Sequence, residues 1–138
     1  MKLINKNKKN KGFTLIEIIV VLVIMVIMAA IAVPAVTGYI KDARESQYVQ
    51  EADAIYTVVQ TEEAKEKAET NAEPNDSFYN SLPAVINQKL DNEITVTEIT
   101  HTAKSGSAPE KYNFKFTSSN GTAVEVEFSP NTNEMKVK

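Results

Sequence analysis

The sequence predicts an α+β protein, in which a long N-terminal helix is followed by a small antiparallel sheet of three to four strands. Two observations lead to this expectation. An apolar run at residues 13–40 continues without a break into a segment rich in Ala, Glu, Gln and Lys. From residue 93 onward, apolar residues instead tend to alternate with polar ones, as in strands. We expect the apolar half of the helix to lie in a membrane or an assembly, and the amphipathic half to pack on the sheet.

The charge of the chain is divided unevenly along its length. Residues 1–12 carry five lysines and no acidic residue, although the net charge of the whole chain is -3. The remainder has ten basic and eighteen acidic residues, which argues against direct binding of nucleic acid, since such proteins normally present a basic face. The chain has no cysteine, so a disulfide, a thiolate nucleophile and a cysteine metal site are excluded.

The apolar segment is long enough to cross a membrane. The 23 residues from Ile18 to Ile40 carry no charge. At about 1.5 Å per residue such a helix reaches roughly 34 Å, which exceeds the ~30 Å thickness of a bilayer core. The lysine-rich stretch before it predicts a cytoplasmic N-terminus, and the remainder is then expected outside the membrane.

Residues 41–70 contain no Gly or Pro, so the helix is expected to continue through them as the first part of a head formed by residues 41–138. Apolar residues at helical spacing predict one face that packs on the sheet: Val49, Ala52, Tyr56 and Val59, widened by Ile55 and Val58. Charged residues are expected on the opposite face: Glu51, Asp53, Glu62, Lys65 and Glu69.

A loop and a short helix are predicted in residues 71–92. Asn71 to Asp76 is a break, rich in turn-forming residues. Ser81-Leu82-Pro83 is typical of an N-cap with an early proline, which predicts a helix that ends near Leu90.

Residues 93–138 predict the sheet. We expect a strand at 93–100, a flexible loop at 103–110, a hairpin turn at Ser119-Asn120-Gly121 and a last strand at 134–138. One apolar face is expected to meet the helix: Tyr112, Phe114, Phe116, Val124, Val126 and Phe128, extended by Met135 and Val137.

Glu17 is an acid at the start of the apolar segment, where a carboxylate is costly: on insertion scales about 2.5 to 3.5 kcal/mol at the centre of a membrane helix. In one interpretation it is merely an interfacial acid near Lys11. However, Gly12-Phe13-Thr14-Leu15-Ile16-Glu17, between a basic leader and an apolar run, resembles the prepilin motif of type IV pilins and pseudopilins.

The resemblance implies roles for three of these residues. A prepilin peptidase would cut between Gly12 and Phe13, remove the leader 1–12 and methylate the new amine of Phe13. Because buried charges need partners, this amine would pair with Glu17 of its own or a neighbouring subunit. The resemblance implies that this pairing guides subunit addition and sets the axial register.

Pro34 and Gly38 lie within the apolar run. Proline removes one helical hydrogen bond and bends a helix. Resemblance to type IV pilins implies a segment that loses helix in the filament, so Pro34 to Gly38 is a candidate kink or melting point. An ordinary membrane-helix proline is the alternative.

The resemblance implies a structural subunit of a type IV pilus and not an enzyme. The subunit would be a single-pass membrane protein before assembly and part of a homo-oligomeric surface filament afterwards. Its expected partners are the prepilin peptidase, an assembly platform and an ATPase. A pseudopilin of a competence or type II secretion system is the alternative within the family.

Alternatives from other classes have less support. Ala30-Ile31-Ala32 would allow a signal peptidase to release a secreted domain after Ala32. A membrane-anchored enzyme would need catalytic groups, but His101 is the only histidine, and we expect it to be a solvated polar residue.

Glu125 and Glu127 are expected on a solvated sheet face. No cofactor or metal is predicted, although three residues form a weak candidate for a calcium loop: Asn131, Asn133 and Glu134.

Overall fold

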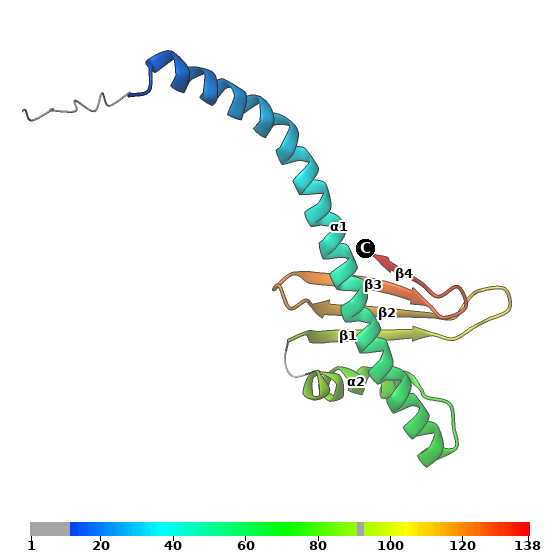
Figure 1. Ribbon diagram of the computed structural model, residues 1–138. Helices are drawn as coiled ribbons and strands as arrows, with labels where there is room; N and C mark the ends of the chain where they lie inside the picture. The colour runs from blue at the N-terminus through cyan, green and yellow to red at the C-terminus, as the bar shows by residue number, and fades with distance from the viewer. Residues whose placement is uncertain (1–11, 91–92) are drawn as a thin grey trace, which may run out of the picture. The chain divides into compact units, whose positions relative to one another are not determined.

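The computed structural model describes residues 12–90 and 93–138. The elements are α1 (Leu15–Thr70), α2 (Asp76–Lys89), β1 (Thr95–Thr102), β2 (Lys111–Thr117), β3 (Ala123–Ser129) and β4 (Glu134–Val137), as Figure 1 shows. A long N-terminal helix with a four-stranded antiparallel sheet confirms the predicted α+β fold class. The chain divides into two compact units, one up to Lys41 and one from Asp42 to Lys138, which we call the head.

The sheet is a simple meander in the order β1-β2-β3-β4. The predicted turn joins β2 to β3, and Gly121 adopts a φ of 82°, a conformation that favours glycine. Gly121 N donates to the Ser118 carbonyl at 2.8 Å, which closes the turn. The register then pairs Phe114 with Val126 and Phe116 with Val124, so apolar residues share one face.

This apolar face forms the core of the head together with α1 and α2. Tyr56 of α1 packs on three aromatic rings of the sheet, with its ring centroid 4.4 Å from that of Phe128 and 5.2 Å from that of Tyr112. On α1 the buried apolar residues are Ala52, Ile55 and Val59. Ile55 therefore lies at the centre of the stripe, whereas Val49 and Tyr56 are half-buried at its borders.

The start of α2 differs from the prediction. The helix begins at Asp76, with Asn75 as its N-cap, and the Asn75 side chain accepts a hydrogen bond from Phe78 N at 3.0 Å. Pro83 therefore lies inside the helix and Ser81 is not a cap, since its hydroxyl donates to the Phe78 carbonyl at 2.7 Å. The prediction was wrong because two cap signals compete here, and the helix capped by Asn75 also buries Tyr79 in the core.

One edge of the sheet is covered by α2. The Asn87 side chain accepts from Val96 N at 2.7 Å and donates to the Val96 carbonyl at 3.1 Å, so it replaces a neighbouring strand at β1. Uncovered strand edges are sites where other chains can pair. Among the described elements, none covers the outer edge of β4 in this way.

Glu51 ties α1 to the turn between β2 and β3. We expected it on the charged face, but only 9 % of its surface is exposed. Its Oε1 atom accepts hydrogen bonds from Ser119 Oγ at 2.6 Å and from Gln47 Nε2 at 2.9 Å. Burial acts to raise the pKa of Glu51, but the hydrogen bonds from Gln47 and the turn serines lower it overall. The prediction was wrong because Ser119, one of these polar partners, lies in a turn 68 residues away in the sequence.

Candidate processing and assembly site

Gly12 and Phe13 precede the first turn of α1 and are exposed, Phe13 by 81 %. A side chain added at Gly12 would meet no atom within 4 Å. Packing within the described residues therefore does not require glycine at residue 12. A protease that holds the backbone closely would require it, because glycine has no side chain to obstruct the approach. Of the predicted leader 1–12, residues 1–11 lie outside the described part of the chain.

Thr14 and Glu17 form a reciprocal cap at the start of α1. Glu17 N donates to Thr14 Oγ1 at 3.3 Å, and Thr14 N donates to Glu17 Oε2 at 3.4 Å. This is the capping box of Ser/Thr-x-x-Glu sequences, which satisfies two backbone N–H groups that a helix leaves without partners. The spacing of Thr14 and Glu17 already indicates this cap in the sequence, but we interpreted Glu17 only through its charge.

The cap also fixes where the Glu17 carboxylate lies. It contacts the backbone N–H of Thr14, the residue that follows Phe13. A free amine on Phe13 would therefore begin one residue from this carboxylate. The helix N-terminus also favours a nearby negative charge. The pairing of the Phe13 amine with Glu17 stays a prediction.

Pro34 and Gly38 lie inside α1, which is helical from Leu15 to Thr70. Pro34 has no N–H to donate to the carbonyl four residues earlier. The Thr37 hydroxyl donates to the Pro34 carbonyl at 2.8 Å. The structure shows the segment in its helical form, and its melting stays a prediction.

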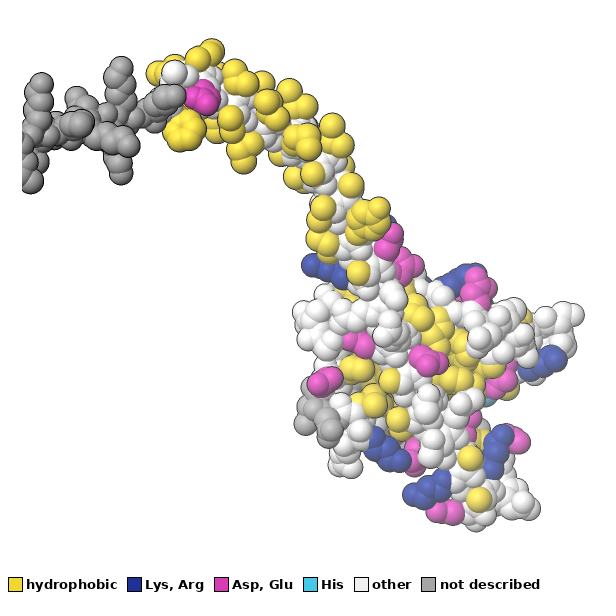
Figure 2. All heavy atoms as spheres, viewed as in Figure 1, with side chains coloured by type: hydrophobic (Ala, Val, Ile, Leu, Met, Phe, Trp, Pro, Cys, Tyr) yellow, Lys and Arg dark blue, Asp and Glu magenta, His cyan; other side chains and the backbone are white. Residues whose placement is uncertain are grey.

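The apolar segment Phe13–Ile40 is exposed along its whole length, and in Figure 2 most side chains on its visible face are hydrophobic. In the described residues, α1 is the one helix long and apolar enough to cross a membrane, by length and composition. An apolar surface of this extent marks a site that meets a membrane or another protein.

Residues 7–33 match the model of the prokaryotic N-terminal methylation motif. The chain carries this methylation motif. It is typical of type IV pilins and pseudopilins, so the resemblance predicted from Gly12 to Glu17 is confirmed. Gly12, Phe13, Thr14 and Glu17 all lie within the methylation motif, at the cap described above. No curated protein and no solved structure matches the chain.

His101 is not the solvated residue that we expected. Its ring lies between those of Tyr79 and Tyr112, at centroid distances of 4.7 and 4.6 Å, and its Nε2 atom is 2.9 Å from Glu110 Oε1. The reason is an irregularity in β1 between Val96 and Glu98. A bulge inserts one residue and shifts the alternation, so inward positions pass from Val96 to Ile99 and His101.

Glu63 joins α1 to both α2 and the sheet. Its Oε1 atom accepts hydrogen bonds from the hydroxyls of Tyr79 at 2.9 Å and Tyr112 at 3.0 Å. Burial, followed by the proximity of Glu63, raises the pKa of both tyrosines well above the ordinary value, so they stay neutral donors. The sequence did not predict this contact, because its three residues lie on three different elements.

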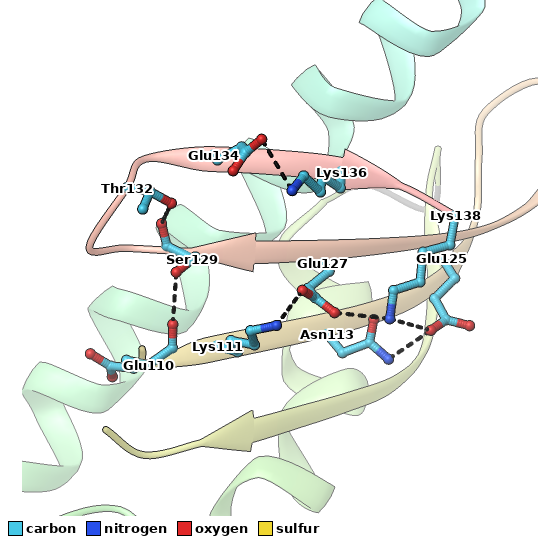
Figure 3. A network of polar contacts seen from close by, with 10 residues as sticks. All are labelled: Glu110, Lys111, Asn113, Glu125, Glu127, Ser129, Thr132, Glu134, Lys136 and Lys138. Carbon is cyan, nitrogen blue, oxygen red and sulfur yellow. Dashed lines mark hydrogen bonds and ion pairs between the residues drawn. The ribbon is translucent and has the colours of Figure 1, made fainter. Parts of the chain in front are cut away.

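Glu125 and Glu127 lie on the outer sheet face and pair with lysines (Figure 3). Lys111 Nζ lies 2.7 Å and Lys138 Nζ lies 3.0 Å from the Glu127 carboxylate. Asn113 Nδ2 donates to Glu125 Oε1 at 3.0 Å. Hydrogen bonds from Lys111 and then Lys138 lower the pKa of Glu127 to about 2. The carboxylates of Glu125 and Glu127 therefore serve as contacts between neighbouring strands.

The stability of the head should therefore decrease in acid in part through Glu127. Its folded-state pKa of about 2 lies below the ordinary value of 4.5, so the stabilisation is present above pH 4.5 and is lost as the pH falls through 2. We expect Glu127→Gln to reduce the dependence of the thermal unfolding midpoint on pH over this range. Circular dichroism melts from pH 2 to 6 measure it, with Glu134→Gln as a control. Equal slopes for wild type and Glu127→Gln would contradict the assignment.

The candidate calcium ligands Asn131, Asn133 and Glu134 lie in the turn between β3 and β4 and at the start of β4. In residues 12–90 and 93–138, no group of three or more His, Asp or Glu side chains is placed to hold a metal ion. Asn133 adopts a φ of 51°, which fits its place in a tight turn.

Proposed function

We propose that the protein is the structural subunit of a type IV pilus filament. The observation that carries this proposal is the methylation motif at the start of an exposed apolar helix, with Glu17 in the first turn of that helix. A soluble protein would have to bury such a surface, whereas here the apolar span of α1 is exposed throughout.

Processing is the first step of the proposed function. A prepilin peptidase cuts the bond between Gly12 and Phe13, removes the leader and methylates the Phe13 amine. The surroundings of Gly12 support this step, because among the described residues no atom beyond its chain neighbours lies within 4 Å of a side chain placed there.

Assembly is the second step. The chain waits in the membrane, held by residues 13–40, and a membrane platform driven by an ATPase transfers it into the filament. There the apolar segment leaves lipid for a bundle of identical helices. Lipid and bundle cover a similar area of apolar surface, so the free-energy change of this transfer is small. The methylated amine of Phe13 pairs with Glu17 of its own or a neighbouring chain. The segment from Pro34 to Gly38 kinks or loses its helical structure when subunits pack.

The intact mass and N-terminal residue of the protein, taken from cells or from co-expression with a prepilin peptidase, test this proposal. A chain that begins at methylated Phe13 supports it. A soluble chain that begins at Val33 would instead mean cleavage after Ala32 and a secreted domain. An uncut chain beside active peptidase would contradict the proposed processing. Electron microscopy of filaments sheared from the cell surface then separates a pilus subunit from a pseudopilin, which is processed in the same way.

A further inference from the structure

A groove of about 300 Å³ opens in the head between α1 and the end of the sheet at β4. Six residues line it: Val49, Gln50 and Asp53 of α1, with Phe128, Asn133 and Met135 of the sheet region. Phe128 is buried, whereas Val49 and Met135 are half-buried. The groove is large enough for an apolar side chain, since a closed cavity of about 150 Å³ already holds benzene.

The groove lies where the core of the head is least covered. On the β1 side, α2 packs on the sheet and Asn87 occupies the strand edge. On the β4 side, no described element covers the sheet or its edge as α2 does at β1. Hydrophobic side chains remain visible beside α1 in Figure 2. An apolar surface rimmed by polar groups marks an interaction site.

The chain itself offers one apolar surface that can fill the groove. Among the described residues, every exposed large hydrophobic side chain lies between Phe13 and Ile40. The head of a second copy therefore has no such side chain to insert, but the end of its apolar segment does. Ile40 and Arg44 lie four residues apart, which places one apolar side chain and one cation on the same helix face.

The charges agree with this match. Arg44 and Asp53 are both exposed, and neither forms an ion pair in the described part of the chain. Ile40 precedes Val49 by nine residues, and Arg44 precedes Asp53 by the same nine. One stagger of about 14 Å between two parallel helices, at 1.5 Å per residue, therefore aligns the apolar pair and the charged pair together.

We propose that a second copy of this chain docks in the groove, with its Ile40 on Val49 and its Arg44 beside Asp53. This contact rests on the proposed self-assembly and specifies the stagger of neighbouring subunits. It uses two different surfaces of one chain, so each copy can receive one neighbour and dock on another without limit, as a filament needs.

Engineered cysteines test the contact directly, because the chain has none of its own. With Ile40→Cys and Val49→Cys in the same chain, oxidation of assembled material should give a ladder of dimers, trimers and longer species. Either cysteine alone should give dimers at most. Ile40→Cys with Lys115→Cys, which lies on the opposite face of the sheet, should give no ladder. The absence of a ladder from the 40/49 pair in filaments that do form would overturn the contact while leaving the proposed function intact.

Charge reversal gives a second and independent test. Arg44→Asp and Asp53→Arg should each lower the filament yield about tenfold, which corresponds to ~1.4 kcal/mol, and the double variant should recover most of it. Lys104→Asp, a matched reversal in an exposed loop, should assemble as wild type does. Protease resistance of the head in the membrane fraction shows that each variant is folded. A double variant no better than the single ones, with folded heads, would contradict the proposed pair.

Discussion

Glu17→Gln should lower filament assembly by about 100-fold or more while leaving the head folded. In the proposed filament the Phe13 amine is buried among apolar helices, and loss of its anionic partner leaves an uncompensated charge. Breaking a buried pair on one side costs about 3 to 5 kcal/mol, and each 1.4 kcal/mol is a factor of ten. The yield of sheared filaments measures the effect, with the amount of processed protein in the membrane as reference.

Thr14→Ala separates the charge of Glu17 from its role as a cap. Glutamine at residue 17 can still bond the Thr14 N–H, so Glu17→Gln removes the charge and keeps an acceptor for the capping box. Thr14→Ala removes the hydroxyl that accepts from Glu17 N and keeps the carboxylate. We expect a modest loss of assembly from Thr14→Ala. If it abolished assembly and Glu17→Gln did not, the cap and not the charge would be the essential feature.

Glu63→Ala should lower the free energy of unfolding of the head by about 3 kcal/mol. Two buried tyrosine hydroxyls donate to the Glu63 carboxylate, and hydrogen bonds to a charged group contribute about 1.5 to 3 kcal/mol each. The Tyr112 hydroxyl also lies near a second acceptor, Glu110 Oε1 at 3.2 Å. Urea unfolding of the full chain in mild detergent, followed by near-ultraviolet circular dichroism of the tyrosines, measures the change.

Two further variants make the Glu63 prediction specific. Glu69→Ala, an exposed acid further along the same helix, should change stability by no more than about 0.5 kcal/mol. Glu63→Leu combined with Tyr79→Phe and Tyr112→Phe should recover part of the loss, because no buried hydroxyl is then left without its acceptor. A large loss in Glu69→Ala, or no loss in Glu63→Ala, would contradict this role of Glu63.

Much of the fold was predictable because local patterns determine it. The absence of Gly and Pro from residues 41–70 predicted an unbroken helix, and alternation around Phe114 and Val126 predicted the buried sheet face. The start of α2 was predicted wrongly because two cap signals lie six residues apart. The burial of His101 was predicted wrongly because a bulge shifts the alternation of β1 by one residue, and no residue type in this strand indicates a bulge.

The candidate site was predictable to a different degree. The motif from Gly12 to Glu17 is contiguous in sequence, so its recognition needed no tertiary structure. The groove, the Glu51 contact and the Glu63 contact each join residues that are far apart in the sequence, for example Glu51 and Ser119. Such contacts depend on the register of the sheet against α1, which the periodicity of one segment does not specify.

The loop from Ala103 to Pro109 lends itself to peptide display. All of its residues are exposed, and the contact between Ser105 and Ala108 closes a small turn within it. Its two ends are held by the His101–Glu110 contact and by the pairing of Thr102 with Lys111, neither of which involves the loop itself. Lengthening a loop costs little once its ends are fixed, about 0.6 kcal/mol for each doubling. A foreign epitope inserted at Gly106 would thus be carried by every copy of the chain, and the proposed filament would present it as a dense, regularly spaced array.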